Sequence, residues 1–537
     1  MSSIHTAYIV NNISLPFDAS FKEAFSVAKK RLSSIGVRCD DVSFSVYRRS
    51  TDARRKSDIR FVYSIRVSGE LPRISEHKLV ANGIAVEQTV TPTVEFGQEK
   101  NNAPIVVVGT GPCGIFCALM LAENGFKPIL LERGGSVGER QCVIKSFART
   151  RILDPNTNIQ FGAGGAGTFS DGKLVTRIND PLSNYILKKL VELGAPDDVL
   201  YIAKPHVGTD ILAVVVQRAL DKISALGGKV LYHTEFTGYE SSLGRVTRVK
   251  TSNGDIECSD LVLAIGHSAR DTYRKLISQG LTFEAKPFSV GMRIEHRAEL
   301  IDKALYGDFA GNPILGHAEY NLSYNTKQRG VYTFCMCPGG VVVAATSEEG
   351  GVVSNGMSYH ARDGVNSNSA VCCSIFKEDY GSTPIAAIEF QQKIERAAFV
   401  AGGSDYSAPI ITVGDFLSGR LSSSPTEVIP TYMDGKGVRL AFAEDYLPSF
   451  VTDNIRAGLM DFDEKINGFA SSTAVLTGAE TRTSSPVRIT RDSQYGTAIG
   501  FTNLYPAGEG AGYAGGITSA AIDGVRTALG IMKKYRP

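Results

Sequence analysis

The sequence predicts an α/β protein with a doubly wound (Rossmann-like) main domain, an inserted and mostly β region, and a separate α+β module in front of it. Three observations support this prediction. Residues 105–122 form an apolar strand, a glycine turn and an apolar helix. A second glycine-framed helix start lies near the C-terminus, at residues 508–517. Between them, residues 271–500 lose the alternation of helix and strand and show many short, turn-bounded strands.

Length and composition limit the class of protein. A chain of 537 residues is too long for one core, so two or three domains are expected. The net charge of +2 does not predict a polyanion partner. Nine scattered cysteines and no secretory segment in the first twenty residues predict a cytoplasmic protein with reduced thiols. The most apolar window, residues 104–122, contains three glycines of the turn motif, which argues against a membrane span.

Residues 1–100 are predicted to form the small N-terminal module. A strand begins at Tyr8, and Ser20 and Glu23 have the spacing of a capping box before a helix that ends at Gly36. Two alternating segments, residues 42–47 and 59–67, follow as strands. The order β-α-β-β predicts a ferredoxin-like fold. Residues 90–103 are interpreted as a linker.

The segment between these two strands, residues 48–56, carries five basic residues and one acid, and we expect a solvated turn. RNA binding is an alternative for this module. It would use the bases Arg48, Arg49, Arg54, Arg55 and Lys56 and exposed sheet aromatics, for which Phe61 and Tyr63 are the candidates. The near-neutral charge of the whole chain argues against nucleic acid as the partner.

Residues 101–270 are predicted to be the first part of the dinucleotide-binding domain. Gly109, Gly111 and Gly114 stand in G-x-G-x-x-G spacing directly after a β-branched strand, residues 105–108. The three glycines permit a tight turn, close approach of backbone to a pyrophosphate, and close packing of helix on strand. Glu132 follows a second apolar strand at about the place, roughly 20 residues on, where a ribose-binding carboxylate is expected.

Several later segments are predicted to contact the same cofactor. The arginines of the loop at residues 133–140 have the reach to bind phosphate oxygens. A glycine-dense stretch, residues 161–174, repeats the G-x-G-x-x-G spacing, but no apolar strand precedes it. We therefore expect a loop that contacts a planar ligand and no second nucleotide fold. A β-meander begins near Phe236, and a buried strand returns to the pyrophosphate at Gly266.

The C-terminal part, residues 501–537, completes the domain. Gly508 and Glu509 precede a final helix that starts at Gly516 and Ile517. Two glycine-framed helix starts far apart in sequence suit one long cofactor, and FAD fits better than NAD. Glu509 is predicted to bind the ribityl hydroxyls, and the second helix start to stabilise negative charge on the reduced flavin. The predicted cofactor-binding residues are Gly109, Gly111, Pro112, Cys113, Gly114, Glu132, Arg133, Arg140, Gly165, Gly167, Thr168, Asp171, Lys173, Phe236, Gly266, Gly508, Glu509, Gly516 and Ile517.

At this point the chain resembles a known family, the uncharacterised FAD-dependent dehydrogenases that are labelled NAD(FAD)-utilising. The resemblance covers nearly the whole chain and rests on residues 107–114, 164–174, 204–210, 291–296, 332–340, 355–358, 480–489 and 505–516. It implies a glutathione-reductase-type FAD-binding fold behind a small ferredoxin-like domain, and redox chemistry on an unidentified substrate. The chain departs from related flavoproteins at Glu509, where aspartate is usual, and at Met292, where a small aliphatic residue is expected.

Basic residues inside the family-like motifs of the inserted region are the catalytic candidates. Arg293, Arg482 and Arg488 suit an anionic small-molecule substrate, because guanidinium groups bind carboxylates with two parallel hydrogen bonds. His296 is a candidate general acid. Tyr513 is a candidate for covering the flavin ring or donating a proton. For each residue, an ordinary structural role is the alternative.

Two cysteines one residue apart, Cys335 and Cys337, are expected to share one side of a strand. Buried inert thiols or a redox pair are the two interpretations. No metal is expected, because these thiols and the adjacent Cys372 and Cys373 do not make an obvious four-ligand set.

The predicted function is that of an FAD-dependent oxidoreductase. The alternatives are a flavin monooxygenase and an RNA-associated flavoprotein of the tRNA-modification type. No second strand–G-x-G-x-x-G–helix unit is present, so NAD(P)H is expected to dock only transiently as electron donor. A redox partner protein is the other source of electrons.

Overall fold

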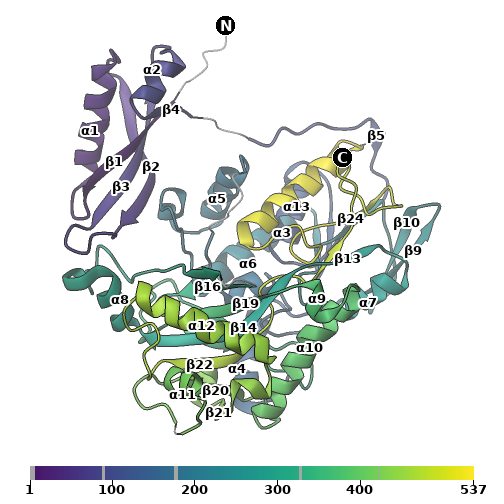
Figure 1. The fold of residues 1–537 in the computed structure, drawn as a ribbon. Helices are drawn as coiled ribbons and strands as arrows, with labels where there is room; N and C mark the ends of the chain where they lie inside the picture. Colours follow the sequence, from purple (N-terminus) through teal and green to yellow (C-terminus); the bar gives the residue numbers. More distant parts are fainter. Residues whose placement is uncertain (1–6, 88–90, 175–179, 326–328, 423) are drawn as a thin grey trace.

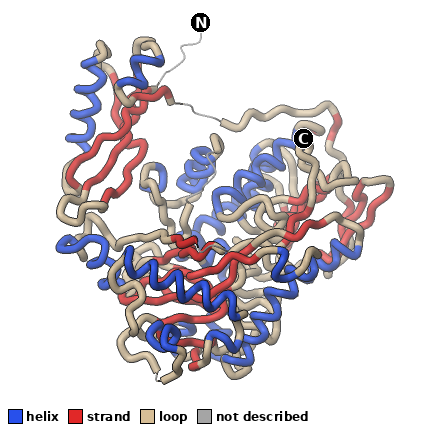
Figure 2. Tube along the Cα trace, in the orientation of Figure 1, coloured by secondary structure: helices blue, strands red, loops and turns tan. Residues whose placement is uncertain are grey.

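The computed structural model describes residues 7–87, 91–174, 180–325, 329–422 and 424–537. Figure 1 shows a small N-terminal unit beside a larger body, and Figure 2 shows the strands of that body gathered in two regions flanked by helices. Val90, the first residue of the predicted linker, lies outside the described residues. The linker also contains a short strand, β5 (Glu99–Lys100), that pairs in parallel with β25 (Tyr535–Arg536) at the C-terminus.

The N-terminal unit has four antiparallel strands in the order β2-β3-β1-β4. Its elements are β1 (Tyr8–Pro16), α1 (Phe21–Ser34), β2 (Val42–Asp52), β3 (Arg60–Gly69), α2 (Glu76–Ala81) and β4 (Ile84–Val86). The predicted capping box is confirmed, since the backbone N–H of Ser20 donates to the Glu23 carboxylate over 2.7 Å. The helix ends where predicted.

One prediction for this unit is wrong, and the RNA-binding alternative lacks the exposed aromatics that it requires. Strand β2 continues through residues 48–52, which pair with β3 after a β-bulge, so the predicted turn begins later. Phe61 and Tyr63 are buried and pack edge-on against Phe17 and Phe21. Because they face inward, they offer no exposed surface on which an RNA base could stack.

The main domain is built on a five-stranded parallel sheet in the order β24-β12-β6-β7-β8. Its strands are β6 (Ile105–Val108), β7 (Ile129–Leu131), β8 (Lys229–Leu231), β12 (Asp260–Leu263) and β24 (Leu504–Pro506). The sheet draws its last strand from the C-terminal part of the chain, as predicted for a domain that is interrupted by an insertion. β6 lies at its centre and is buried throughout.

The two faces of this sheet are covered differently. Helices α3 (Pro112–Glu123), α6 (Thr209–Ala225) and α13 (Ile517–Met532) pack with Ile105 and Val107 on one face. Val106 and Val108 point the other way, as strand alternation requires, toward the meander β9 (Phe236–Ser242), β10 (Arg245–Thr251) and β11 (Ile256–Glu257). The helix α7 (Arg270–Ser278) lies against β9. The second face is therefore covered mainly by a β-meander, which differs from a sheet wound by helices on both faces.

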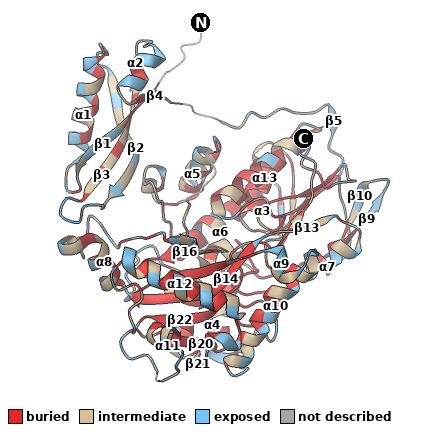
Figure 3. Cartoon of the chain, in the orientation of Figure 1, coloured by how far each residue is buried: buried red, intermediate tan, exposed pale blue. Residues whose placement is uncertain are grey.

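The inserted region contains a seven-stranded mixed sheet in the order β15-β16-β19-β14-β22-β20-β21. These strands are β14 (Phe288–Arg297), β15 (Ser323–Asn325), β16 (Gly330–Cys337), β19 (Asn366–Ile375), β20 (Ala408–Thr412), β21 (Val438–Leu440) and β22 (Val475–Glu480). Its largest helices are α10 (Pro384–Ala401) and α12 (Ser449–Lys465). Figure 3 shows the central strands as a continuous buried layer.

Smaller elements complete the body. They are α4 (Val137–Thr150), α5 (Ser183–Glu192), α8 (Ala298–Tyr306), α9 (Lys377–Tyr380), α11 (Val413–Ser418), β13 (Phe283–Ala285), β17 (Val341–Ala344), β18 (Ser354–Met357) and β23 (Val487–Ile489). The pairs β17–β18 and β13–β23 form two-stranded sheets.

The glycine turn after β6 lets α3 pack directly on the strand. A Cβ on Gly114 would stand 1.9 Å from the carbonyl oxygen of Gly109, and Gly109 itself has a positive φ of 99°. We predict that Gly114→Ala lowers the free energy of unfolding by about 2 kcal/mol or more, because backbone must move to admit the methyl group. Urea denaturation measures the effect.

Gly138 in α4 provides the matched control, since a Cβ there meets no atom within 4 Å. Gly138→Ala is expected to leave stability unchanged or to raise it by up to about 1 kcal/mol through helix propensity. Equal urea midpoints for the two variants would contradict the close-packing explanation.

Candidate functional site

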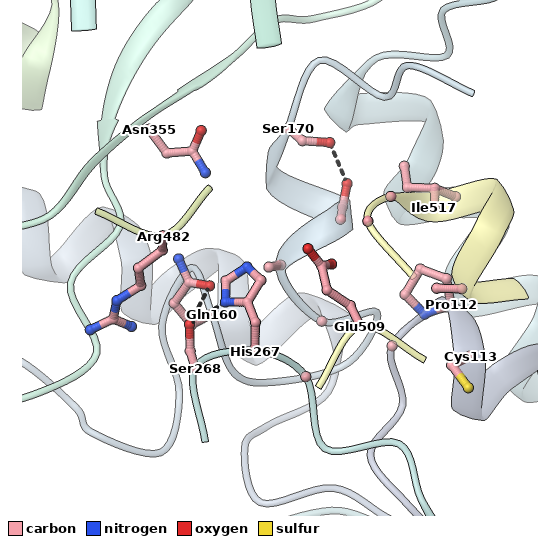
Figure 4. A pocket seen from close by; sticks show the side chains of 18 of the residues that line it. Pro112, Cys113, Gln160, Ser170, His267, Ser268, Asn355, Arg482, Glu509 and Ile517 are labelled. Atoms are coloured by element: carbon pink, nitrogen blue, oxygen red, sulfur yellow. Dashed lines mark hydrogen bonds between the residues drawn. The ribbon is translucent and has the colours of Figure 1, made fainter. Parts of the chain in front are cut away.

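A cavity of about 400 Å³ opens at the carboxyl ends of the parallel strands. Gly109 follows β6, Gly266 follows β12 and Glu509 follows β24, and all three line it. The inserted sheet closes the other side with Asn355 and Glu480. Figure 4 shows Glu509, His267, Arg482 and Asn355 around one open space. The cavity thus lies between the parallel-sheet domain and the insertion.

The first helix start forms one wall of the cavity. Gly109, Gly111, Pro112 and Cys113 line it, whereas Gly114 lies beneath the turn and packs on its backbone. Gly111 is the N-cap of α3, so the unpaired N–H groups of the first helical turn are at this wall. Such a helix start favours negatively charged phosphate groups.

Glu132 lines the cavity as predicted and is already bonded inside the protein. Its carboxylate accepts hydrogen bonds from the Thr110 hydroxyl (2.5 Å), and from the backbone N–H groups of Thr110, Gly134 and Gly162 (3.2, 2.9 and 3.0 Å). Four contacts use most of the accepting capacity of a carboxylate. Glu132 therefore also fixes the turn and the neighbouring loop.

The two predicted phosphate-binding arginines are placed differently. Arg133 lines the cavity, but its guanidinium pairs with Glu235 (2.9 Å) and Asp271 (2.6 Å). Arg140 is fully buried and donates to the carbonyls of Asn158, Ile159 and Ala163 at 2.7–2.8 Å. The prediction that Arg140 contacts phosphate is wrong: its guanidinium, whose pKa burial lowers to about 9, holds the loop at residues 158–163.

The glycine-dense loop contacts the cavity over most of its length. Gly165, Gly167, Asp171 and Lys173 line it. Thr168 does not: its side chain is buried behind the loop, where its hydroxyl has no hydrogen-bond partner among the described residues. The loop forms a short 3₁₀ turn at residues 166–169, and this turn rotates Thr168 away from the cavity.

The C-terminal segment supplies another part of the wall, close to the first helix start, since Gly167 lies beside both Ile517 and Pro112 (Figure 4). Glu509, Gly516 and Ile517 line the cavity, and Phe236 and Gly266 lie in the same lining. Gly508 does not, because it faces Cys113 and donates its N–H to Asp523 over 2.7 Å. Its positive φ of 75° instead turns the chain so that Glu509 points into the space.

Glu509 is the strongest candidate in this wall for binding a ligand through a hydrogen bond. Its carboxylate makes no hydrogen bond with any residue that the structure describes, and desolvation raises its pKa to about 7. At Gly515 and Gly516 a Cβ would meet open space. A cavity with two neighbouring helix starts in its wall, and near them a carboxyl that has no described hydrogen-bond partner, fits a dinucleotide that carries hydroxyl donors.

Two of the catalytic candidates are structural residues. Arg293 has no exposed surface, and its guanidinium donates to Glu480 (2.7 and 3.2 Å), to the Cys335 carbonyl and to Asn355. His296 is buried, donates its ring Nε2–H to the Phe469 carbonyl at 2.7 Å, and has its pKa lowered to about 4 by burial. Neither residue is among the described residues that line the cavity. The His296 ring packs against Phe469 in the core, and the Arg293 guanidinium lies behind the cavity-lining residues Asn355 and Glu480.

Arg482 does line the cavity, and its charge is compensated. It donates to Glu395 at 3.0 and 3.2 Å and to the Ser347 hydroxyl at 2.5 Å.

Tyr513 does not line the cavity, so the prediction that it covers the flavin ring or donates a proton is wrong. Its hydroxyl accepts from the Arg491 N–H (3.2 Å), and the Arg491 guanidinium lies 3.8 Å from the ring centroid. Arg488 covers the same ring.

Cys335 and Cys337 do not share one face of the strand. Cys335 has a positive φ of 47° at a break in the pairing of β16, which directs its side chain into the cavity. Cys337 is buried and donates its thiol to the Cys335 carbonyl. Desolvation raises the pKa of Cys335 to about 11, so its thiol is protonated.

Sequence reasoning missed several residues of the lining. They are Gln160, Lys204, His267, Ser268, Glu319, Asn355 and Cys335. His267 directly follows Gly266, so the predicted junction of a buried strand with a glycine was a usable signal for it. Lys204, Cys335 and Asn355 lie in the family-like motifs at residues 204–210, 332–340 and 355–358, which was a signal for them, whereas no local pattern marks Gln160, Ser268 and Glu319.

Comparison with known proteins shows the class of protein to which this chain belongs. A family model described as "FAD-dependent protein, C-terminal domain-like" matches residues 287–483, and a domain of unknown function (DUF8436) matches residues 9–68. The first match covers most of the inserted sheet and agrees with the cavity that this sheet closes. The protein is an FAD-dependent flavoprotein.

The family follows from a full-length relative. An uncharacterized protein of Clostridium beijerinckii is 43% identical to this chain over 531 residues, which is 98% of both chains. The chain therefore belongs to the same family as that protein.

Solved structures give weaker matches. L-amino acid deaminase from Proteus vulgaris has a TM-score of 0.36 and 11% identity, with 83% of this chain and 94% of that chain covered. Glycine oxidase from Bacillus cereus has a TM-score of 0.31 and 11% identity, with 81% and 96% covered. CtdE, solved in complex with FAD, also has a TM-score of 0.31 and 11% identity, with 81% and 84% covered. At these TM-scores the overlaps place no residue of this chain.

Two further features concern the described residues as a whole. None of their helices is long and apolar enough to cross a membrane. They also contain no cluster of three or more His, Cys, Asp or Glu side chains suited to a metal ion.

The raised pKa of Glu509 makes the stability of the cofactor-free protein depend on pH. In the unfolded chain a glutamate ionises near pH 4.3, whereas folded Glu509 ionises near pH 7. Between these values the folded state binds more protons, so wild-type stability falls as the pH rises. We predict that Glu509→Gln becomes progressively more stable than wild type from pH 5 to pH 8, as measured by urea midpoints.

The exposed Glu257→Gln variant is the control and should show no such trend. A constant difference between Glu509→Gln and wild type across this range would mean that the carboxyl is ionised throughout.

Proposed function

We propose that the protein is an FAD-dependent oxidoreductase that acts on an anionic small molecule. One observation carries the proposal: a single cavity is lined by both glycine-framed helix starts, with Glu509 between them and the inserted sheet opposite. FAD supplies a two-electron redox centre when it is bound. A cavity that continues past the helix starts to Asn355 and Cys335 leaves room for a substrate.

The residues of this chain have separate roles in the proposal. Gly111 and the start of α3 hold the pyrophosphate through backbone N–H groups, and Glu509 accepts hydroxyl groups of the ribityl chain. The start of α13, at Gly516 and Ile517, directs its positive dipole end at the redox ring and favours added negative charge there. Glu132 holds the turn at Thr110 in place.

The substrate preference comes from the charges at the far end of the cavity. Asp171 and Glu319 are bridged by Arg362 at 2.8 Å on each side. Lys173 lies 3.7 Å from Asp171, and Lys204 lies 3.9 Å from Glu319. Three cations against two carboxylates leave a net positive charge, and the two lysines with the longest ion-pair distances face the cavity. We therefore assign the preference for an anionic substrate to Lys173 and Lys204 instead of to the arginines that the sequence suggested.

The remaining expectations stay proposals. NAD(P)H would dock transiently, because the described sheet contains one strand–glycine turn–helix unit of this kind. The N-terminal unit is proposed to be a ferredoxin-like module that supports an electron-transfer or protein partner. Cytoplasmic localisation rests on the unpaired cysteines. A monooxygenase reaction has no specific residue in its favour.

We predict that the purified protein carries flavin absorbance that is bleached under anaerobic conditions by NADH or NADPH. Gly111→Asp should lack this absorbance, because a carboxylate at the helix start repels a pyrophosphate. The expected loss of FAD affinity is at least about 100-fold, since both a favourable site and its charge complementarity are removed. FAD titration of the cofactor-free variant measures it.

Gly138→Asp is the matched control, because Gly138 is exposed in the first turn of α4 and away from the cavity. It should keep the wild-type flavin spectrum. Equal flavin content in the Gly111→Asp and Gly138→Asp variants would argue against binding at the first helix start.

The lysine subsite makes a separate prediction. Lys204→Met should weaken binding of benzoate by about twofold to fivefold, the usual worth of one partly exposed charge, and leave benzamide binding unchanged. The shift of the flavin absorbance on titration reports both ligands. Lys303→Met, on the exposed side of α8, is the control and should affect neither. Equal losses for benzoate and benzamide would indicate a change of shape instead of charge.

A further inference from the structure

His267 lies in the cavity wall between the strand β12 and the helix α7. Its ring points into the space that Glu509, Arg482 and Asn355 surround (Figure 4). One ring nitrogen, Nδ1, lies 2.8 Å from the Ser268 hydroxyl. The other nitrogen, Nε2, makes no hydrogen bond with the residues that the structure describes.

The neighbours of His267 determine which nitrogen carries the proton. The side-chain amide of Gln160 donates to the Ala345 carbonyl over 3.2 Å, which turns its oxygen toward Ser268. The Ser268 hydroxyl then donates to that oxygen over 3.0 Å. Because the hydroxyl proton is used, the Ser268 oxygen can only accept from His267. The proton of a neutral ring must therefore be on Nδ1, and Nε2 presents a lone pair to the cavity.

The surroundings of His267 also determine the charge of its ring. Burial, and then the positive charges of Arg482 and Arg270, lower the pKa of His267 to about 3, while Glu395 opposes this shift. Both arginines are themselves paired with Glu395, at 2.7 and 3.0 Å, so they remain fixed beside the ring. A ring in this environment is neutral at physiological pH, and its Nε2 acts as an acceptor.

We propose that His267 Nε2 accepts a hydrogen bond from an O–H or N–H group of the molecule held in the cavity. Ser268 and Gln160 are positioning residues that keep the ring in the accepting tautomer. Glu509, on the neighbouring wall, is a second acceptor, so this part of the cavity selects a ligand segment that carries donors. The inference rests on the proposed function, and the donor belongs either to FAD or to the substrate.

The first test measures the tautomer directly in the FAD-loaded protein. Nitrogen-15 NMR of protein labelled at its eight histidines, with the signal assigned by its loss in His267→Phe, should show a neutral ring with protonated Nδ1 from pH 5 to pH 8. Ser268→Ala should shift the ring toward a mixture of tautomers. A proton on Nε2, or a charged ring at pH 6, would overturn the proposal.

The second test identifies the donor. FAD and benzamide, which carries N–H donors, are titrated into wild type, His267→Phe and His267→Gln. If the donor belongs to FAD, its Kd should rise about threefold to tenfold with phenylalanine and recover with glutamine, whose side-chain oxygen can accept. If the donor belongs to the substrate, the benzamide Kd should rise and recover instead.

The exposed His233→Phe variant is the control for loss of a histidine as such. Unchanged affinities for both ligands in His267→Phe would overturn the inference and leave the proposed function intact. Failure of wild type to bind FAD would instead overturn the proposed function.

Discussion

The site depends on the direct backbone contact between helices α3 and α13. A Cβ on Gly524 of α13 would stand 2.1 Å from the Cys113 carbonyl of α3, so the two helices touch where Gly524 lacks a side chain. This contact lies in the first turn of α3 and two turns into α13, and it fixes the distance between the two helix starts (Figure 1). Two segments that are far apart in the sequence thus become neighbouring parts of one cavity wall. Neither start alone would hold a cofactor as long as FAD.

Buried ion pairs set the second boundary of the cavity. Arg270, at the start of α7, and Arg482, after β22, share the carboxylate of Glu395 on α10. Arg293 is paired in the same way with Glu480. Removing one partner from such a pair leaves a buried charge and is strongly destabilising. The Arg270–Glu395 pair joins the helix that follows His267 to the insertion, and the other two pairs lie within the insertion.

The N-terminal unit is joined to the body next to Lys204 of the cavity wall. The backbone of Arg49 in β2 donates to the Tyr201 carbonyl (2.7 Å) and accepts from the Ala203 N–H (2.8 Å), which adds a short body segment to the edge of the sheet. Lys204, the next residue along, lines the cavity. This contact occupies part of an otherwise open strand edge. It also connects the small unit, through a hydrogen bond, to Ala203, the residue that precedes Lys204.

The sequence by itself determined the elements whose signals are local. The strand at residues 105–108, the glycine turn, the helix capped by Ser20 and the final helix lie where their patterns predicted, because apolar period, capping residues and glycine act within a few positions. Motif spacing also selected Gly111, Glu509 and Gly516, and all three line the cavity. Only the tertiary structure decided what the charged residues do. Arg140, Arg293 and His296 are buried, and Lys204 and His267 line the cavity, because the partner of a side chain depends on segments far away in the chain.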